Sequence, residues 1–317
     1  MASTSDAMPS SAMEESPNWL EMPPELMASI LQRLGAVEIL NSARKVCTTW
    51  RRICKDPDIW KTIDMHKPVD TWDTDYDLEI LTKQAVDLSC GELIDISIEY
   101  FGSDDLLDHI LLRSSKLKNL CLMNCFDITG SRLSQAVKRV PQLEKLHLSY
   151  ISINVEDIEL IGQNCPHLKS FKLNKEFRRP RIENDDDALA IANNMPELRH
   201  LQVFGSKMSN DGLEAILNSC PHLESLDVRR CFNLNLGGNL GKLCIERIKD
   251  FKRPNDSTEN CGFHPRIHEF DDFDDMYSSG YSDVDEFSEG DFYEDYEFSG
   301  GSAVSEEDDY DYEYFDI

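Results

Sequence analysis

Cysteine and tryptophan side chains stand close together in the stretch CTTWRRICKDPDIW, residues 47–60. A cysteine thiolate binds zinc when further Cys or His ligands are near, and a tryptophan beside basic residues can stack on nucleic-acid bases. Cys47 and Cys54 have no His near them in the sequence. The stretch therefore favours helix packing by Trp50 and Trp60 over a metal site, with its basic residues on a solvated helix face.

A second cluster lies in CGFHPRIH, where Cys261, His264 and His268 have the spacing C-x-x-H-x-x-x-H. Three such side chains could supply three zinc ligands. Pro265 disfavours a helix that would pair the two His residues, and the sequence offers no evident fourth ligand. We therefore expect a solvated linker and no metal or other cofactor.

Enzyme motifs are missing from the chain. It contains no G-x-S-x-G, no G-x-x-x-x-G-K-[ST] and no H-E-x-x-H, and it lacks the paired C-x-x-C motifs of a RING domain. The glycines of LGGNLG, around Gly237, lack the lysine of a phosphate-binding loop and are interpreted as a turn. We therefore expect no catalytic residue and a protein that is not an enzyme.

The charge of the chain is concentrated at one end. The formal net charge is −28, and residues 269–317 hold 20 acidic and no Lys or Arg side chains. The preceding 268 residues hold 32 basic and 40 acidic side chains, a net of −8. Because binding to phosphate backbones needs a basic face, we expect no nucleic-acid partner.

The chain carries no apolar segment near the ~20 residues that span a bilayer, and its start, MASTSDAMPSSAMEESP, has no basic or apolar run typical of a secretory signal. We therefore expect no membrane partner and a location in the nucleus and/or cytoplasm. In such a reducing compartment the ten cysteines should remain thiols.

The leucines of the middle of the chain repeat at a regular spacing. LKNLCLMNC, LEKLHLSYI, LKSFKLNKE, LRHLQVFGS and LESLDVRRC follow one another, with LIDISIEYF as a looser earlier copy. L-x-x-L-x-L places apolar side chains on one side of a short strand, and segments such as SNDGLEAILNSCP have helical spacing. The predicted inward-facing residues are Leu120, Leu122, Leu146, Leu148, Phe171, Leu173, Leu201, Val203, Leu226 and Val228.

These copies resemble cysteine-containing leucine-rich repeats, since Cys125 and Cys231 fall where that subtype has Asn or Cys. The segment before them resembles an F-box, from Met22-Pro23-Pro24-Glu25-Leu26 through ILQRL and VCTTWRRIC to DPDIW, with Met22 in place of Leu. An F-box followed by such repeats is similar to F-box/LRR-repeat proteins, and the wording is most similar to plant members. The resemblance implies the substrate-recognition subunit of an SCF-type (Skp–cullin–F-box) ubiquitin ligase.

The resemblance also implies partners and a docking surface. The F-box would bind a Skp-type adaptor, and through it cullin and RING subunits, while the repeats would bind an unknown protein target. Two alternatives stay open: an F-box adaptor outside a ligase, and an acidic-tail binder or chaperone of basic proteins. The predicted adaptor-binding residues are Pro23, Leu26, Ile30, Leu31, Leu34, Val46 and Trp50.

The predicted fold is α/β: a small three-helix F-box, a leucine-rich-repeat solenoid of about six repeats and a disordered acidic tail. The predicted boundaries are 1–16 for a disordered start, 17–64 for the F-box, 65–84 for a linker or capping segment, 85–250 for the repeats and 251–317 for a linker and the tail. Strand neighbours of the core leucines should face a target on the inner side. The predicted target-binding residues are Lys145, His147, Lys172, His200, Phe204 and Arg229, with the cations receiving an acidic or phosphorylated segment and Phe204 as an apolar anchor.

Overall fold

The computed structural model describes residues 22–66, 76–175, 182–259 and 261, all within the compact unit Met1–Glu269. The predictions for residues 1–16, for the acidic tail, and for His264 and His268 concern residues outside these ranges.

The N-terminal module is a group of short helices. A proline begins the first helix because its missing N–H would have no partner there. The elements are α1 (Pro24–Gln32), a continuous run of α2 (Ala36–Glu38), η1 (Ile39–Ala43) and α3 (Arg44–Val46), then α4 (Thr48–Ile53) and the 3₁₀ helix η2 (Pro57–Lys61). Cys47 breaks the helical run with an extended backbone, and its Sγ accepts a hydrogen bond from Trp50 N.

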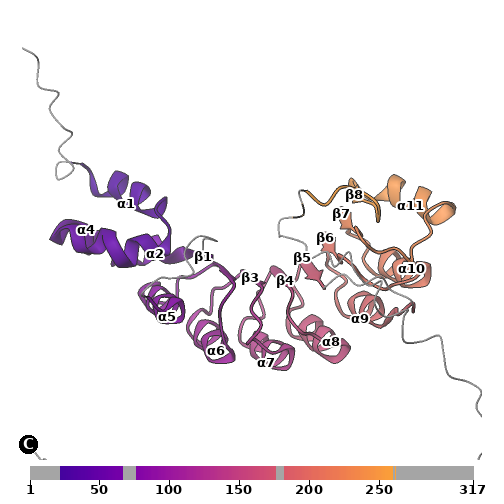
Figure 1. The fold of residues 1–317 in the computed structure, drawn as a ribbon, viewed down its shortest axis with the longest axis horizontal. Coiled ribbons are helices and arrows are strands. Elements are labelled where there is room, and N and C mark those ends of the chain that lie inside the picture. Colours follow the sequence, from indigo (N-terminus) through magenta and orange to yellow (C-terminus); the bar gives the residue numbers. More distant parts are fainter. Residues whose placement is uncertain (1–21, 67–75, 176–181, 260, 262–317) are drawn as a thin grey trace, which may run out of the picture. The chain divides into compact units, whose positions relative to one another are not determined.

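One parallel sheet of eight strands follows, and its strands lie in the order of the sequence (Figure 1). The strands are β1 (Thr62–His66), β2 (Asp95–Glu99), β3 (Asn119–Met123), β4 (Lys145–Ser149), β5 (Ser170–Asn174), β6 (His200–Gln202), β7 (Ser225–Asp227) and β8 (Asp250–Lys252). Because parallel strands need a crossover connection, a helix can return the chain between successive strands.

The helices of the repeats cover the outer side of the sheet, while the strands succeed one another along the inner side (Figure 1). They are α5 (Leu78–Leu88), α6 (Asp104–Arg113), α7 (Gly130–Ala136) with the 3₁₀ turn η3 (Val137–Arg139), α8 (Val155–Asn164), α9 (Asp186–Asn194), α10 (Asn210–Ser219) and α11 (Asn239–Arg247). Polar residues begin several of them: Asn154 and Asp157 form a capping box on α8.

The core lies between sheet and helices. All ten residues predicted to point inward are buried, with Leu173 the most exposed of them at 4%. From the helices, Ile158, Ile161, Leu213 and Ile216 meet them with no exposed surface. The repeat register is therefore confirmed, since a slip by one residue would have turned every one of these side chains to the other face.

The sheet extends beyond the residues predicted to form repeats. β1 overlaps the predicted end of the F-box and α5 begins inside the segment predicted as a linker, so eight strands stand where about six repeats were predicted. The sequence of β1, TIDMH, contains no leucine, but Ile63 and Met65 alternate into the core and are fully buried. A short strand of this kind lacks the leucine pattern by which the other copies were found.

Candidate functional site

Helix α1 carries two apolar stripes side by side. Met27 and Leu31 are buried, at 2% and 0% exposure, and face the core of the module. Leu26 is one residue away and 56% exposed, and Ile30, one turn later on the same side, is half-buried. The second stripe lies outside the core of the module and leaves apolar area exposed to solvent.

Two further aliphatic side chains of the module are exposed. Leu34, just after the helix, is 44% exposed, and Val46, at the end of α3, is 61% exposed. Pro23 is exposed as well, and Trp50 is half-buried and packs against the core. Of the predicted adaptor-binding residues, Leu31 is corrected: it is a core residue, because its place on α1 is on the buried stripe.

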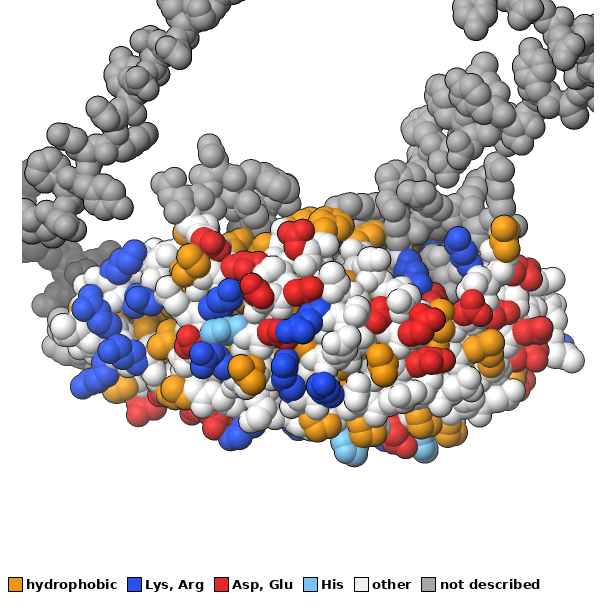
Figure 2. Space-filling model, turned by 90° about the horizontal axis from the view of Figure 1, so that it is seen from below, with side chains coloured by type: hydrophobic (Ala, Val, Ile, Leu, Met, Phe, Trp, Pro, Cys, Tyr) orange, Lys and Arg blue, Asp and Glu red, His pale blue; other side chains and the backbone are white. Residues whose placement is uncertain are grey.

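Basic side chains lie beside this apolar surface. Arg44, Lys45, Arg51, Arg52 and Lys55 come from α3, α4 and the turn after α4, and all except the half-buried Arg44 are exposed. Figure 2, seen from the side of helices α5 to α9, shows Lys and Arg side chains gathered at the F-box end. Of these, Arg51, Arg52 and Lys55 were predicted from the sequence to lie on a solvated helix face, and they are exposed.

The cysteines and tryptophans of residues 47–60 serve packing. Trp60 is 1% exposed, and its Nε1 donates to the carbonyl oxygen of Cys54 at 2.9 Å. Burial raises the pKa of the Cys54 thiol, which keeps it protonated. Among the described residues no group of three or more His, Cys, Asp and Glu side chains is placed to hold a metal ion.

The inner face of the sheet carries the residues predicted to bind a target. The register sets His147 on β4 beside Lys172 on β5, and Lys145 beside Ser170. Lys145 and His200 are exposed, while His147 and Lys172 are half-buried. The structure thus brings Lys145, His147, Lys172 and His200 together on β4 to β6.

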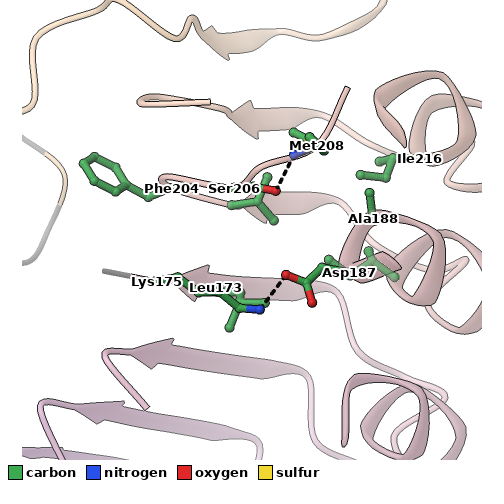
Figure 3. Close-up of a pocket in the computed structure, with 10 residues that line it drawn as sticks. Leu173, Lys175, Asp187, Ala188, Phe204, Ser206, Met208 and Ile216 are labelled. Atoms are coloured by element: carbon green, nitrogen blue, oxygen red, sulfur yellow. Dashed lines mark hydrogen bonds and ion pairs between the residues drawn. The ribbon is translucent and has the colours of Figure 1, made fainter. Parts of the chain in front are cut away.

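Two of the predicted target-binding residues are corrected by the structure. Phe204 is 1% exposed; it lies in the turn after β6, and its ring points away from Ala188 and Ile216 (Figure 3). Arg229 is 2% exposed and is held by its own strand: Nε donates to Asp227 Oδ1 at 2.9 Å, and Nη2 donates to Oδ2 at 2.6 Å. Its Nη1 donates to the carbonyl oxygen of Ser257 at 2.8 Å. Arg229 therefore ties the segment after β8 to the sheet and is not available to a target.

Lys252 takes the place that Arg229 was expected to have. It lies on β8 beside Asp227, in the same cross-strand row as His147 and Lys172, and is half-buried. The leucine pattern does not reveal this strand, because β8 reads DFK and has no leucine.

The local potential on this face is positive. Burial, and after it the nearby Lys172, Lys145 and His200, together lower the pKa of His147 to about 3. Burial also lowers the pKa of Lys172, and Lys252 and Arg229 act in the same direction, against Cys121 and Asp227. His147 is therefore neutral at pH 7, and the charge of the face comes from its lysines.

A small cavity lies between the sheet and α9 (Figure 3). Leu173, Ile191 and Met208 are among its lining residues, and Lys175 Nζ meets Asp187 Oδ2 beside it at 2.5 Å. Its volume of about 10 Å³ holds at most one water molecule, so it is a packing void and no ligand site.

Comparison with known proteins agrees with this architecture. An F-box-like domain matches residues 19–66. F-box protein SKIP19 of Arabidopsis thaliana is 50% identical, over 98% of this chain and 100% of its own length. Putative F-box/LRR-repeat protein 23 of the same plant is 51% identical, over 76% of this chain and 54% of its own length. The chain belongs to the F-box/LRR-repeat family.

The family assignment confirms the resemblance stated from the sequence, including its similarity to plant members. Against the second relative, the chain spans about half the length of the longer protein. Among solved structures, the yeast complex of Rad7 and Elc1 aligns with a TM-score of 0.44 and 17% identity, over 54% of this chain and 44% of that one. No described helix of this F-box/LRR chain has the length and apolarity needed to cross a membrane.

Proposed function

We propose that this protein is the substrate-recognition subunit of an SCF-type ubiquitin ligase. Its F-box binds a Skp-type adaptor, which connects it to cullin and RING subunits, and the inner face of its repeats binds a target protein. The subunit itself forms no bond; it raises the effective concentration of the target near the ubiquitin-loaded enzyme. We place its action in the nucleus and/or cytoplasm.

The observation that carries this proposal is the second apolar stripe of α1 in a domain of the F-box-like family. Leu26 and Val46 are more than half exposed, although the core beneath them is complete. Large apolar side chains that a folded module leaves exposed gain free energy when a partner covers them. The flanking Lys45, Arg51 and Arg52 favour a partner with an acidic surface.

The test compares two double variants in a pull-down with purified adaptor. Leu26→Ala with Val46→Ala removes exposed apolar area from the F-box and should weaken adaptor binding by about 2–3 kcal/mol, roughly a hundredfold. The matched control is Leu112→Ala with Ile245→Ala, which removes side chains that are 70% and 56% exposed on α6 and α11. This control should bind adaptor like the wild type.

Wild-type binding by the F-box variant would refute the adaptor surface. The same pull-down, probed for cullin, separates the ligase from an F-box adaptor that acts outside one: adaptor without cullin favours the latter. An acidic-tail binder of basic proteins would lose its partners on deletion of residues 269–317, whereas a receptor acting through its repeats would keep them.

A further inference from the structure

Several lysines at the rim of the sheet form ion pairs with glutamates. At the rim of the sheet, Lys118 and Lys169 meet Glu144 at 3.0 and 2.8 Å, and Lys249 meets Glu224 at 2.9 Å. The hydrogen bond from Lys169, and after it the one from Lys118, lowers the pKa of Glu144 to about 2. On the outer side, too, acidic and basic side chains lie interspersed (Figure 2).

No such anion meets the lysines of the inner face. Lys145 on β4, Lys172 on β5 and Lys252 on β8, here called the basic row, form no hydrogen bond or ion pair with any other residue in the described ranges. The two nearby carboxylates are engaged, since Asp227 accepts from Arg229 and Asp250 accepts from Ser225 Oγ at 3.1 Å. Within the described residues, these three cations thus share one face of the sheet without a counter-charge.

The unpaired state costs free energy, most of all at Lys172. This ammonium group is half-buried and lies near Lys252 and Arg229, so it loses water without gaining an anion. An anionic group of another molecule would supply the missing counter-charge and would also offset the repulsion from the neighbouring cations. A positive surface that faces a negative surface of the partner is the usual electrostatic arrangement of a protein interface.

The N-terminal strands limit where an anion can lie. Asp64 on β1 and Asp95 and Glu99 on β2 make that end of the sheet acidic. An anionic partner is therefore confined to β4 through β8. With ~4.8 Å between strands, this part of the face is about 19 Å wide, which about six residues of extended chain can cross.

We propose that the basic row is the docking site for an extended, Asp- and Glu-rich segment of the target protein. This inference rests on the proposed receptor function, because it names the chemistry of the target. The lysines stand on β4, β5 and β8 and do not converge on one point, so they suit carboxylates spaced along a peptide better than a single phosphate group. His147, beside Lys172 on the neighbouring strand, is a neutral hydrogen-bonding group at pH 7.

The test is fluorescence anisotropy with the full-length protein and a labelled peptide of about eight residues, sized to the face, that alternates Glu and Ser. A control peptide carries Gln in place of Glu. The inner variant combines Lys145→Met, Lys172→Met and Lys252→Met. The rim variant combines Lys116→Met, Lys169→Met and Lys249→Met, which removes the same charge from lysines that pair with Glu92, Glu144 and Glu224.

The wild type should bind the Glu peptide and not the Gln peptide. The inner variant should bind the Glu peptide at least about tenfold more weakly, a change of ~1.4 kcal/mol, and the rim variant should bind it within about twofold of the wild type. Binding should weaken as salt rises. Equal binding of the two peptides, an equal loss in both variants, or tighter binding of a peptide with one phosphoserine would each overturn the proposal.

A second measurement needs no peptide. Because Lys172 is unpaired and half-buried, Lys172→Met should raise the melting temperature of the free protein, whereas Lys169→Met should not. A lower melting temperature for Lys172→Met would mean that the ammonium already has a stabilising partner, which contradicts the basic row. These experiments use no adaptor, so their failure is distinguishable from failure of the proposed adaptor docking.

Discussion

The ion pair of Arg229 with Asp227 is the part of the inner face that most strongly determines stability, and replacing Arg229 with Met tests this. The guanidinium makes three hydrogen bonds to the carboxylate, at 2.9, 3.1 and 2.6 Å, and a fourth to the carbonyl oxygen of Ser257 at 2.8 Å. Both side chains are withdrawn from water, with exposures of 2% for Arg229 and 5% for Asp227.

The expected loss follows from what the substitution leaves behind. Met fills much of the space of Arg229, but the Asp227 carboxylate stays buried without its partner, which costs about 3–5 kcal/mol. The carbonyl of Ser257 loses its donor at the same time, so the segment after β8 loses its connection to the sheet. An exposed pair of the same chemistry should behave differently: Arg199 and Glu224 are 50% and 36% exposed, and losing that pair should cost below about 1 kcal/mol.

Urea unfolding followed by circular dichroism gives the free energies. The set consists of Arg229→Met, Asp227→Asn, their combination, and Arg199→Met as the matched control. Since the two side chains satisfy each other, the combined variant should lose less than the sum of the single variants by about 1–3 kcal/mol. Additive losses, or an Arg229→Met variant within about 1 kcal/mol of the wild type, would show that the ion pair contributes little and that Arg229 is open to a target, as the sequence predicted.

Two further predictions concern the pH dependence of stability and the packing between repeats. The pKa of His147 is about 3 in the folded protein and about 6.5 in the unfolded one, so the unfolded state binds the proton first as pH falls. The contribution of His147 to stability is therefore complete above pH ~6.5 and is lost as pH falls toward about 3. His147→Gln should therefore show a smaller drop in urea midpoint over that range, and an unchanged drop would contradict the buried, neutral state. Gly162→Ala should destabilise the protein by about 1–3 kcal/mol, because the new Cβ would stand 2.8 Å from Asn194 O, while Gly238→Ala has nothing within 4 Å and should have little effect on the melting temperature.

The core of the repeats was predictable from the sequence because the leucine spacing of each copy specifies a strand and its buried face. L-x-x-L-x-L fixes both the strand and the face that is buried, and all ten inward residues could be named before their contacts were known. The same local rule found the helical stripe of Leu213, Ile216 and Leu217. The rule missed β1 and β8, because TIDMH and DFK contain no leucine. These segments form strands by pairing with the neighbouring strands β2 and β7.

The surface of the F-box was predictable in part. Apolar residues at helical spacing on α1 marked Leu26, Ile30 and Leu31 as important, but periodicity does not tell which stripe the rest of the module covers. The packing of the run from α2 to α4 buries Leu31 and leaves Leu26 exposed. That choice belongs to tertiary structure, since either stripe is apolar enough to be the core.

The charge of the inner face was likewise predictable from the sequence only in part. The alternation of the strands determined that Lys145, His147 and Lys172 share a face, and the sequence alone placed them there. Whether a cation is free depends on which anions lie near it: Arg229 has a carboxylate two residues away on its own strand, whereas Lys172 has none within reach in the described residues. The alternation along each strand determines which way these side chains point. Which of them forms an ion pair is determined only by the folded sheet, because ion pairing depends on distances of a few ångströms between strands that are far apart in the chain.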